Sequence, residues 1–104
     1  MGLSVYIKGD NLFERNITHN VGKMAKEAGL YEVLWRPEEL GITYAGKMIA
    51  PLEMGLGLLL GDPEKYKKFN PENGWGSYEG LINFVERYLD ACRTHPDKEI
   101  SVER

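Results

Sequence analysis

Residues 77–92 read SYEGLINFVERYLDAC, and this stretch predicts the longest helix of the chain. Its apolar side chains recur every three or four residues, which places them on one helical face. Ser77 is a typical N-cap residue directly before the first turn. Because this face has to be buried, the rest of the chain must supply a covering layer. The apolar positions are Tyr78, Leu81, Ile82, Val85, Tyr88, Leu89 and Cys92.

Two short strands are predicted at opposite ends of the chain. Leu3, Val5 and Ile7 alternate with less apolar residues, as do Ile100 and Val102, and this two-residue period is typical of a strand with one buried face. An isolated strand would leave its backbone groups unpaired. We therefore expect the two strands to pair with each other, in a direction that the sequence leaves open.

A first helix is predicted over residues 19–28. Thr18 supplies an N-cap, and Gly29 stands where a left-handed residue ends many helices. Pro37 is suited to the first position of a further helical turn, which Gly41 then closes.

A central helix is predicted after Thr43, which we expect to act as its N-cap. Pro51 falls inside the helical pattern, so we expect a kink there, caused by a clash with the carbonyl of Lys47. Small residues form a stripe on this helix that would let another backbone approach closely. The stripe consists of Gly46, Ala50, Gly57 and Gly61.

These elements predict a single domain over residues 1–104 with a predominantly helical α+β fold. Three main helices are expected to pack against a small sheet made by the N- and C-terminal strands.

Composition excludes several classes of protein. The formal net charge is −3, whereas a domain dedicated to duplex DNA carries a basic surface. The longest apolar run, residues 54–60, is far shorter than the roughly 20 residues that span a bilayer, so we expect no membrane attachment. Cys92 is the single cysteine and cannot form an intramolecular disulfide. With no secretory signal at the start, the expected location is the cytoplasm.

The segment most typical of a binding site is residues 70–78, NPENGWGSY. Glycines on both sides of Trp75 free the backbone, and a helix start follows, where N–H groups lack partners. Lysines lie just upstream, and aromatic rings, including Tyr66 and Tyr78, offer faces for stacking. The sequence thus predicts a site for a nucleotide or another phosphorylated small molecule. Its candidate residues are Lys65, Lys67, Lys68, Asn70, Asn73, Trp75, Gly76, Ser77 and Tyr78.

The same segment has a structural interpretation, in which Trp75 fills the core, Ser77 only caps a helix and the lysines form a solvated face. Because no complete phosphate-loop signature is present, both interpretations stay open. His19 and Asn20, at the start of the first helix, are added to the candidate ligand-binding residues, with a helix-entry hydrogen-bond cluster as the alternative.

Other chemistry has little support in the sequence. Cys92 and His95 are three residues apart, but a metal site would need further ligands, so no metal and no cofactor are expected. No nucleophile motif is present, and no carboxylate stands in an apolar run that would shift its pKa. We therefore predict no catalytic residues.

Three motifs resemble those of small uncharacterised proteins encoded by bacteriophages and prophages. They are NITHNVGKMA at residues 16–25, LWRPEE at 34–39 and FNPENGWGSYEGL at 69–81. The resemblance implies an infected bacterial cytoplasm as the setting and carries no assigned activity.

The leading hypothesis is a non-enzymatic binding protein that captures a small anionic ligand at residues 70–78. The alternative is a protein–protein interaction module that binds a host protein through the small-residue stripe of the central helix. The same stripe would also permit a homodimer.

Overall fold

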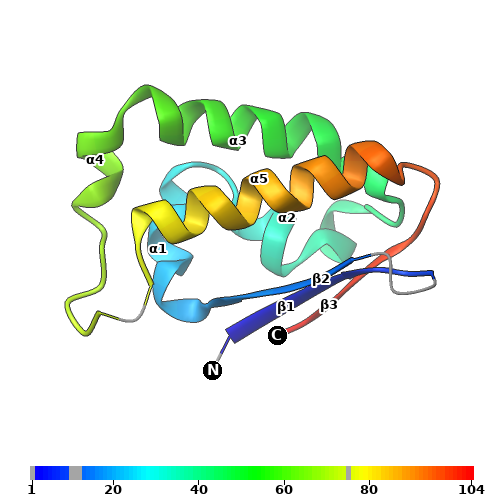
Figure 1. Cartoon of the computed structure of the whole chain (residues 1–104), viewed down its shortest axis with the longest axis horizontal. Helices are drawn as coiled ribbons and strands as arrows, with labels where there is room; N and C mark the ends of the chain where they lie inside the picture. Colours follow the sequence, from blue (N-terminus) through cyan, green and yellow to red (C-terminus); the bar gives the residue numbers. More distant parts are fainter. Residues whose placement is uncertain (1, 10–12, 75) are drawn as a thin grey trace.

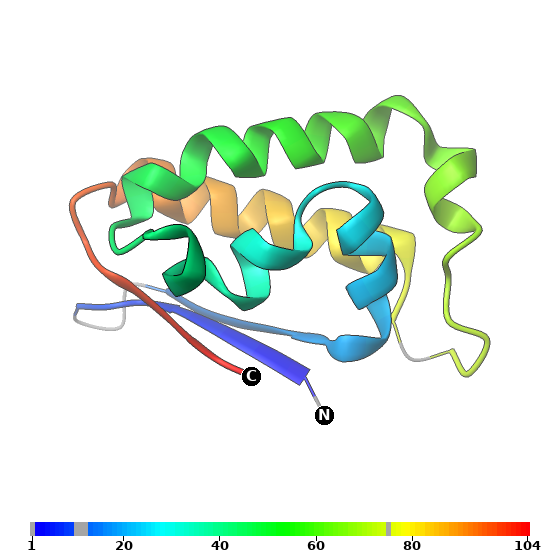
Figure 2. The same ribbon diagram turned by 180° about the vertical axis from the view of Figure 1, so that it is seen from behind.

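The computed structural model of the chain describes residues 2–9, 13–74 and 76–104. Figure 1 shows two layers, a small sheet and a group of helices stacked over one of its faces. Seen from behind, the helices again lie on that one side (Figure 2). The fold is therefore α+β, as predicted.

The sheet joins the two ends of the chain. Strand β1 (Gly2–Ile7) lies in the middle, between β2 (Phe13–Thr18) and β3 (Ile100–Glu103), and both neighbours are antiparallel to it. Val5 stands opposite Val102 in this register. The predicted pairing of the terminal strands is confirmed, and its direction is antiparallel.

Strand β2 was not predicted, so the sheet has one strand more than the two terminal strands expected from the sequence. Glu14, Arg15 and Asn16 are all exposed in the middle of β2. An edge strand of this kind has no alternation of apolar and polar residues, and the period that reveals a strand is missing.

Helix α5 (Tyr78–Thr94) covers the core-facing side of the sheet. Phe84 and Tyr88 on its apolar face are at most 4% exposed, and the Tyr88 ring stacks on Phe13 of β2 with centroids 5.7 Å apart. From the sheet, Leu3, Val5 and Ile7 enter the same hydrophobic cluster. The apolar face of this helix is thus buried, as its helical spacing of apolar residues predicts.

The connection from β2 to the central helix follows the predicted capping signals. Thr18 accepts a hydrogen bond from the Asn20 N–H at 3.2 Å, and Gly29 and Gly41 have φ angles of +74° and +72°. The elements between these residues are short. They are η1 (His19–Val21), α1 (Gly22–Glu27), α2 (Tyr31–Trp35) and η2 (Pro37–Leu40).

The start of the central helix differs from prediction. A 3-10 turn, η3 (Ala45–Met48), precedes α3 (Ile49–Gly61). Thr43 is not the N-cap, because the residue before η3 is Tyr44 and the residue before α3 is Met48, and neither start has a side-chain cap. Pro51 lies in the first turn of α3, where an N–H has no helical partner in any case. The predicted interior kink at Pro51 is therefore wrong.

The predicted close approach at the small-residue stripe occurs at Gly46, where an added Cβ would lie 3.0 Å from the Pro96 carbonyl oxygen, but not at the stripe's two glycines in α3. A Cβ on Gly57 or Gly61 would meet nothing within 4 Å, whereas one on Gly55 would overlap the side chain of Leu30. The close approach to α3 therefore occurs at Gly55. After α3, the short helix α4 (Pro63–Lys67) is capped by the carboxylate of Asp62.

Within the described part of the chain, no helix is both long and apolar enough to cross a bilayer.

Candidate functional site

The segment between α4 and α5 is held by two of the residues predicted to bind a ligand. Asn70 Oδ1 accepts a hydrogen bond from the Tyr78 N–H at 2.8 Å, and Ser77 Oγ accepts one from the Gly80 N–H at 3.0 Å. Both bonds satisfy N–H groups at the start of α5 that have no helical partner. Asn73 lies in the exposed turn of this segment, and Trp75 lies outside the described residues.

Gly76 brings this segment against the end of β2. Its φ is +102°, and an added Cβ would lie 2.6 Å from Thr18 Cγ2 and 2.8 Å from Val21 Cγ1. The absence of a side chain therefore lets the chain before α5 contact the β2–η1 corner. Two regions that are more than fifty residues apart in sequence meet here.

The predicted stacking faces of Tyr66 and Tyr78 are not available, so this part of the prediction is wrong. The two side chains are only 2% and 5% exposed. The Tyr78 hydroxyl donates a hydrogen bond of 2.5 Å to the carbonyl of Leu59, and burial raises the pKa of Tyr78 above its usual value. Both rings belong to the hydrophobic core.

The three lysines lie along α4 and the turn after it. Lys65 Nζ lies 5.3 Å from the centroid of the Tyr66 ring, and Lys67 Nζ lies 5.6 Å from that of Tyr78 and 3.8 Å from a carboxylate oxygen of Glu79. Lys68 is exposed. Lys67 is thus partly neutralised by an acidic residue in the first turn of α5, and the lysines do not form a focused cationic site.

A hollow of about 190 Å³ lies between β2 and the first turns of α5; we call it the β2–α5 hollow. Gly76 and Ser77, both predicted site residues, line it. Arg15 and Asn83 line it too, and the sequence analysis missed both. Its remaining lining residues are Asn16, Ile17, Val21, Gly80 and Phe84.

Arg15 is the cation of the β2–α5 hollow. It stands opposite Val5 in the sheet, which places it on the side that faces α5, and its side chain is exposed. Among the described residues no carboxylate forms an ion pair with it. The hollow therefore combines the guanidinium of Arg15, a hydroxyl, two side-chain amides and the positive end of a helix of 17 residues.

His19 and Asn20 line a different hollow. It has a volume of about 680 Å³, is open to solvent and lies on the sheet face that the helices leave uncovered, beside Gly2 and Ser4. His19 Nε2 is buried and has no hydrogen-bond partner among the described residues. Asn16 and Ile17 line both hollows, so only strand β2 separates this hollow from the β2–α5 hollow.

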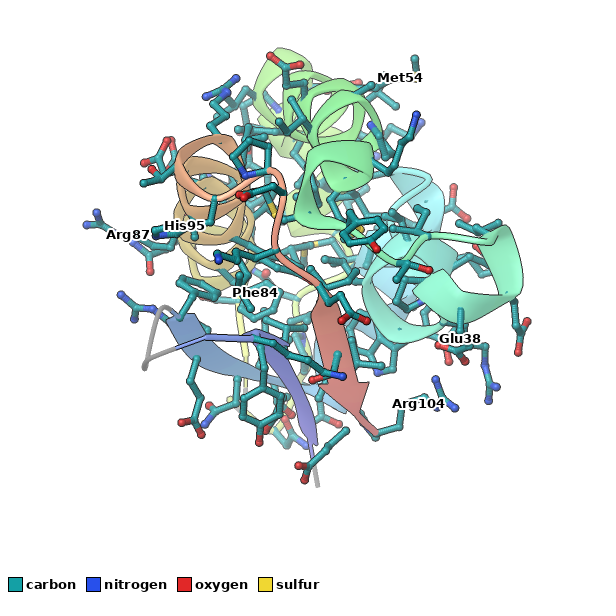
Figure 3. The ribbon with its side chains drawn as sticks, turned by 90° about the vertical axis from the view of Figure 1, so that its right-hand side faces the viewer. Glu38, Met54, Phe84, Arg87, His95 and Arg104 are labelled. Carbon is teal, nitrogen blue, oxygen red and sulfur yellow. The ribbon has the colours of Figure 1, made fainter. Side chains whose placement is uncertain are left out.

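A second feature is the exposed side of α3, made of Ala50, Met54, Gly57, Leu58, Leu60 and Gly61; we call it the α3 surface. Three of its apolar side chains are 49–71% exposed. Figure 3 shows Met54 pointing away from the body of the molecule. The one charged residue of α3, Glu53, is bound by Arg93 of α5 at 2.7 Å. This surface therefore presents no unpaired charge.

The described part of the chain holds neither a metal-ligand cluster nor an exposed thiol. No three His, Cys, Asp or Glu side chains there are close enough to hold a metal ion. Cys92 is buried, and desolvation raises the pKa of its thiol to about 12, so the reactive thiolate is scarce at neutral pH.

Comparison with protein-family models, with curated proteins and with solved structures gave no match.

Proposed function

We propose that this protein binds a small ligand through an anionic group, a phosphate or a carboxylate, held in the β2–α5 hollow. The observation that carries the proposal is that Arg15, which forms no ion pair among the described residues, lines the same hollow as Ser77 and Gly80 at the start of α5. Guanidinium groups bind oxyanions in bidentate fashion, and a helix start adds positive potential. The proposed role is binding without chemical conversion of the ligand.

The size of the hollow limits what it holds. Ligand pockets usually measure about 300–1,000 Å³, whereas this hollow has about 190 Å³. It accommodates the charged end of a ligand and leaves the rest outside, over exposed side chains such as Asn16 and Asn83. A nucleotide bound in this way would be held mainly by its phosphate.

The test is an NMR titration of isotope-labelled protein with inorganic phosphate, AMP and uncharged adenosine. We expect phosphate and AMP to shift the amide signals of Gly76, Ser77 and Gly80, and adenosine to leave them in place. Arg15→Ala should weaken binding of AMP at least tenfold, and added salt should weaken it in the wild type, because the attraction of an exposed guanidinium is screened.

Lys98→Ala is the matched control, since it removes one positive charge from an exposed position beyond the far end of α5. It should leave affinity unchanged. The proposal fails if folded wild-type protein binds neither phosphate nor AMP nor any member of a panel of phosphorylated and carboxylated metabolites. It also fails if the two variants weaken binding equally.

A second candidate function is protein binding through the α3 surface. The observation that favours it is the exposure of Met54, Leu58 and Leu60 on a helix with one charged residue. Since the resemblance to phage-encoded proteins implies an infected bacterial cytoplasm, a host protein is the partner proposed for this surface.

A further inference from the structure

Two of the five arginines of the chain form no ion pair among the residues that the structure describes. They are Arg15 on β2 and Arg87 on α5, and both side chains are exposed. Each of the other three arginines binds a carboxylate at 2.7–3.0 Å. Arg15 and Arg87 are therefore the arginines that remain available to an anionic ligand.

Helical spacing places Arg87 on the side of α5 that lines the β2–α5 hollow. Gly80, Asn83 and Arg87 follow one another at intervals of three and four residues, so they share one face of the helix. Gly80 and Asn83 both line the hollow. Because Cα–Cβ bonds in a helix tilt toward its N-terminus, the Arg87 side chain starts off toward the turn that carries Asn83. Figure 3 shows Arg87 directed away from the body of the molecule, on the same side as β2.

Two contacts determine how α5 lies on β2. Gly76, just before α5, packs on the β2–η1 corner, and the Tyr88 ring stacks on Phe13 at the start of β2. The helix and the strand therefore run side by side in opposite directions. Arg15 is on the same face of β2 as Phe13 and about 7 Å from it, and Arg87 precedes Tyr88. The two arginines thus belong to neighbouring stretches of the strand and the helix.

The nearest acidic residues of the described chain do not neutralise this pair of arginines. Glu14 points to the sheet face that the helices leave uncovered. Glu86 precedes Arg87, and consecutive residues of a helix do not face each other. Asp90, one turn further along α5, lies 3.8 Å from Arg93. An anion beside the hollow would therefore meet two guanidinium groups and no competing carboxylate.

We propose that the ligand of the β2–α5 hollow carries a diphosphate, two phosphate groups joined to each other. This inference rests on the proposed function and names the class of its ligand. One phosphate occupies the hollow beside Ser77 and Arg15, and the second lies at its mouth between Arg15 and Arg87. A monophosphate would fill the first position and leave Arg87 without a partner.

The size of the hollow agrees with this division. Its volume of about 190 Å³ is below the roughly 300 Å³ at which pockets begin to enclose a whole ligand. The second phosphate therefore projects toward the exposed amide of Asn83 and the guanidinium of Arg87. Guanidinium groups bind phosphate oxygens in bidentate fashion, so each arginine contributes to orientation as well as to attraction.

Calorimetric titrations of the full chain with phosphate, pyrophosphate, AMP and ADP, at constant ionic strength and without divalent cations, test this inference. We expect ADP to bind about tenfold more tightly than AMP, because it gains the contacts of a second phosphate. Arg87→Ala should remove most of this preference and leave the affinity for AMP nearly unchanged. Tighter binding of pyrophosphate than of phosphate would identify the diphosphate group as sufficient, whereas a preference seen with ADP alone would identify a nucleoside diphosphate.

An NMR signal reports the contact directly. The side-chain Nε–H signal of Arg87 should shift when ADP is added and stay in place when AMP is added. The matched control is Arg93→Ala, which removes the same side chain from the same helix where it binds Glu53 of α3. It should leave the preference for ADP unchanged, and melting curves establish that both variants are folded.

The inference is overturned if ADP binds no more tightly than AMP, or if Arg87→Ala and Arg93→Ala weaken ADP binding equally. It is also overturned if ADP binds and the Arg87 signal does not move. In each of these cases AMP still binds beside Arg15, so the proposed function stands. Absence of binding by all four compounds and by the wider metabolite panel overturns both proposals.

Discussion

The hydroxyl of Tyr78 donates a hydrogen bond of 2.5 Å to the backbone carbonyl of Leu59. Leu59 belongs to the last turn of α3, where carbonyls have no helical partner, and Tyr78 is the first residue of α5. The buried Tyr78 side chain, at the start of α5, thus supplies a hydrogen-bond donor to a carbonyl in the last turn of α3. This bond connects the two longest helices at the end of the molecule where the β2–α5 hollow lies.

We expect Tyr78→Phe to lower the free energy of unfolding by about 1–3 kcal/mol, because it leaves the buried Leu59 carbonyl without a donor. Urea unfolding followed by circular dichroism measures the change. Tyr44→Phe is the control, since Tyr44 is 52% exposed and should lose almost nothing. Equal stability of the two variants would show that the Tyr78 bond contributes no net stability.

Gly76→Ala should destabilise the protein much more than Gly74→Ala. Both glycines have positive φ, so each substitution forces an L residue into a conformation that costs about 1–2 kcal/mol. At Gly74 the added methyl meets nothing within 4 Å, whereas at Gly76 it would collide with Thr18 and Val21. Thermal unfolding of the two variants separates backbone strain from steric overlap. Similar melting temperatures would contradict the packing of Gly76 on the β2–η1 corner.

A chain that ends at Lys98 should be strongly destabilised. It loses the pairing of β3 with β1 and the burial of Ile100, which is 8% exposed, and losing a buried Ile side chain costs about 2–5 kcal/mol. It also loses the hydrogen bond from Arg104 to the carbonyl of Trp35. Differential scanning calorimetry measures the change, with Arg104→Ala as a control that keeps β3. A truncated chain with the wild-type melting temperature would show that β3 is dispensable.

The sequence predicted those elements in which apolar periodicity and capping chemistry agree. Helix α5 combines a continuous apolar face with the Ser77 cap, and the terminal strands show the two-residue period, so all three were found. Strand β2 was missed because its middle residues are polar and exposed, and the start of α3 was misplaced because a 3-10 turn has no periodicity of its own.

The same physical reasons decide how much of the site could be predicted. Gly76 and Ser77 were singled out from local turn and cap chemistry, and both line the β2–α5 hollow, which is the candidate site. Arg15 could not be found, since its position depends on a strand that the sequence did not reveal. Tyr78 was counted both on the apolar face of its helix and as a stacking surface, and burial in the core excludes the second role.

The free energy of unfolding should fall at alkaline pH because the thiol of Cys92 is buried. Burial raises the pKa of its thiol to about 12 from an ordinary value of 9.0. The native state therefore keeps a proton that the unfolded chain loses, so the stabilisation is complete below pH 9 and is lost as pH rises towards 12. Urea unfolding between these pH values measures the effect. The free energy of unfolding should fall less steeply with pH in Cys92→Ala than in the wild type, by up to about 1.4 kcal/mol per pH unit. Parallel curves would contradict a buried, protonated thiol.

Gly55 and Gly57 offer a matched pair of substitutions within one helix. In an open helical position Ala is more favourable than Gly by about 0.8–1.0 kcal/mol. Gly57 is such a position, since a Cβ there meets nothing within 4 Å, so Gly57→Ala should raise the free energy of unfolding by roughly that amount. Gly55→Ala gains the same helical preference, but its methyl would overlap the side chain of Leu30.

Because Leu30 is 0% exposed and surrounded by the core, it cannot move aside without disturbing its neighbours. We therefore expect Gly55→Ala to lower stability by about 1–3 kcal/mol, the usual cost of overpacking. Urea unfolding compares the two variants directly. If both substitutions stabilise the protein, Leu30 has room to retreat, and the close approach of the α1–α2 connection to α3 is not the reason for the glycine at position 55.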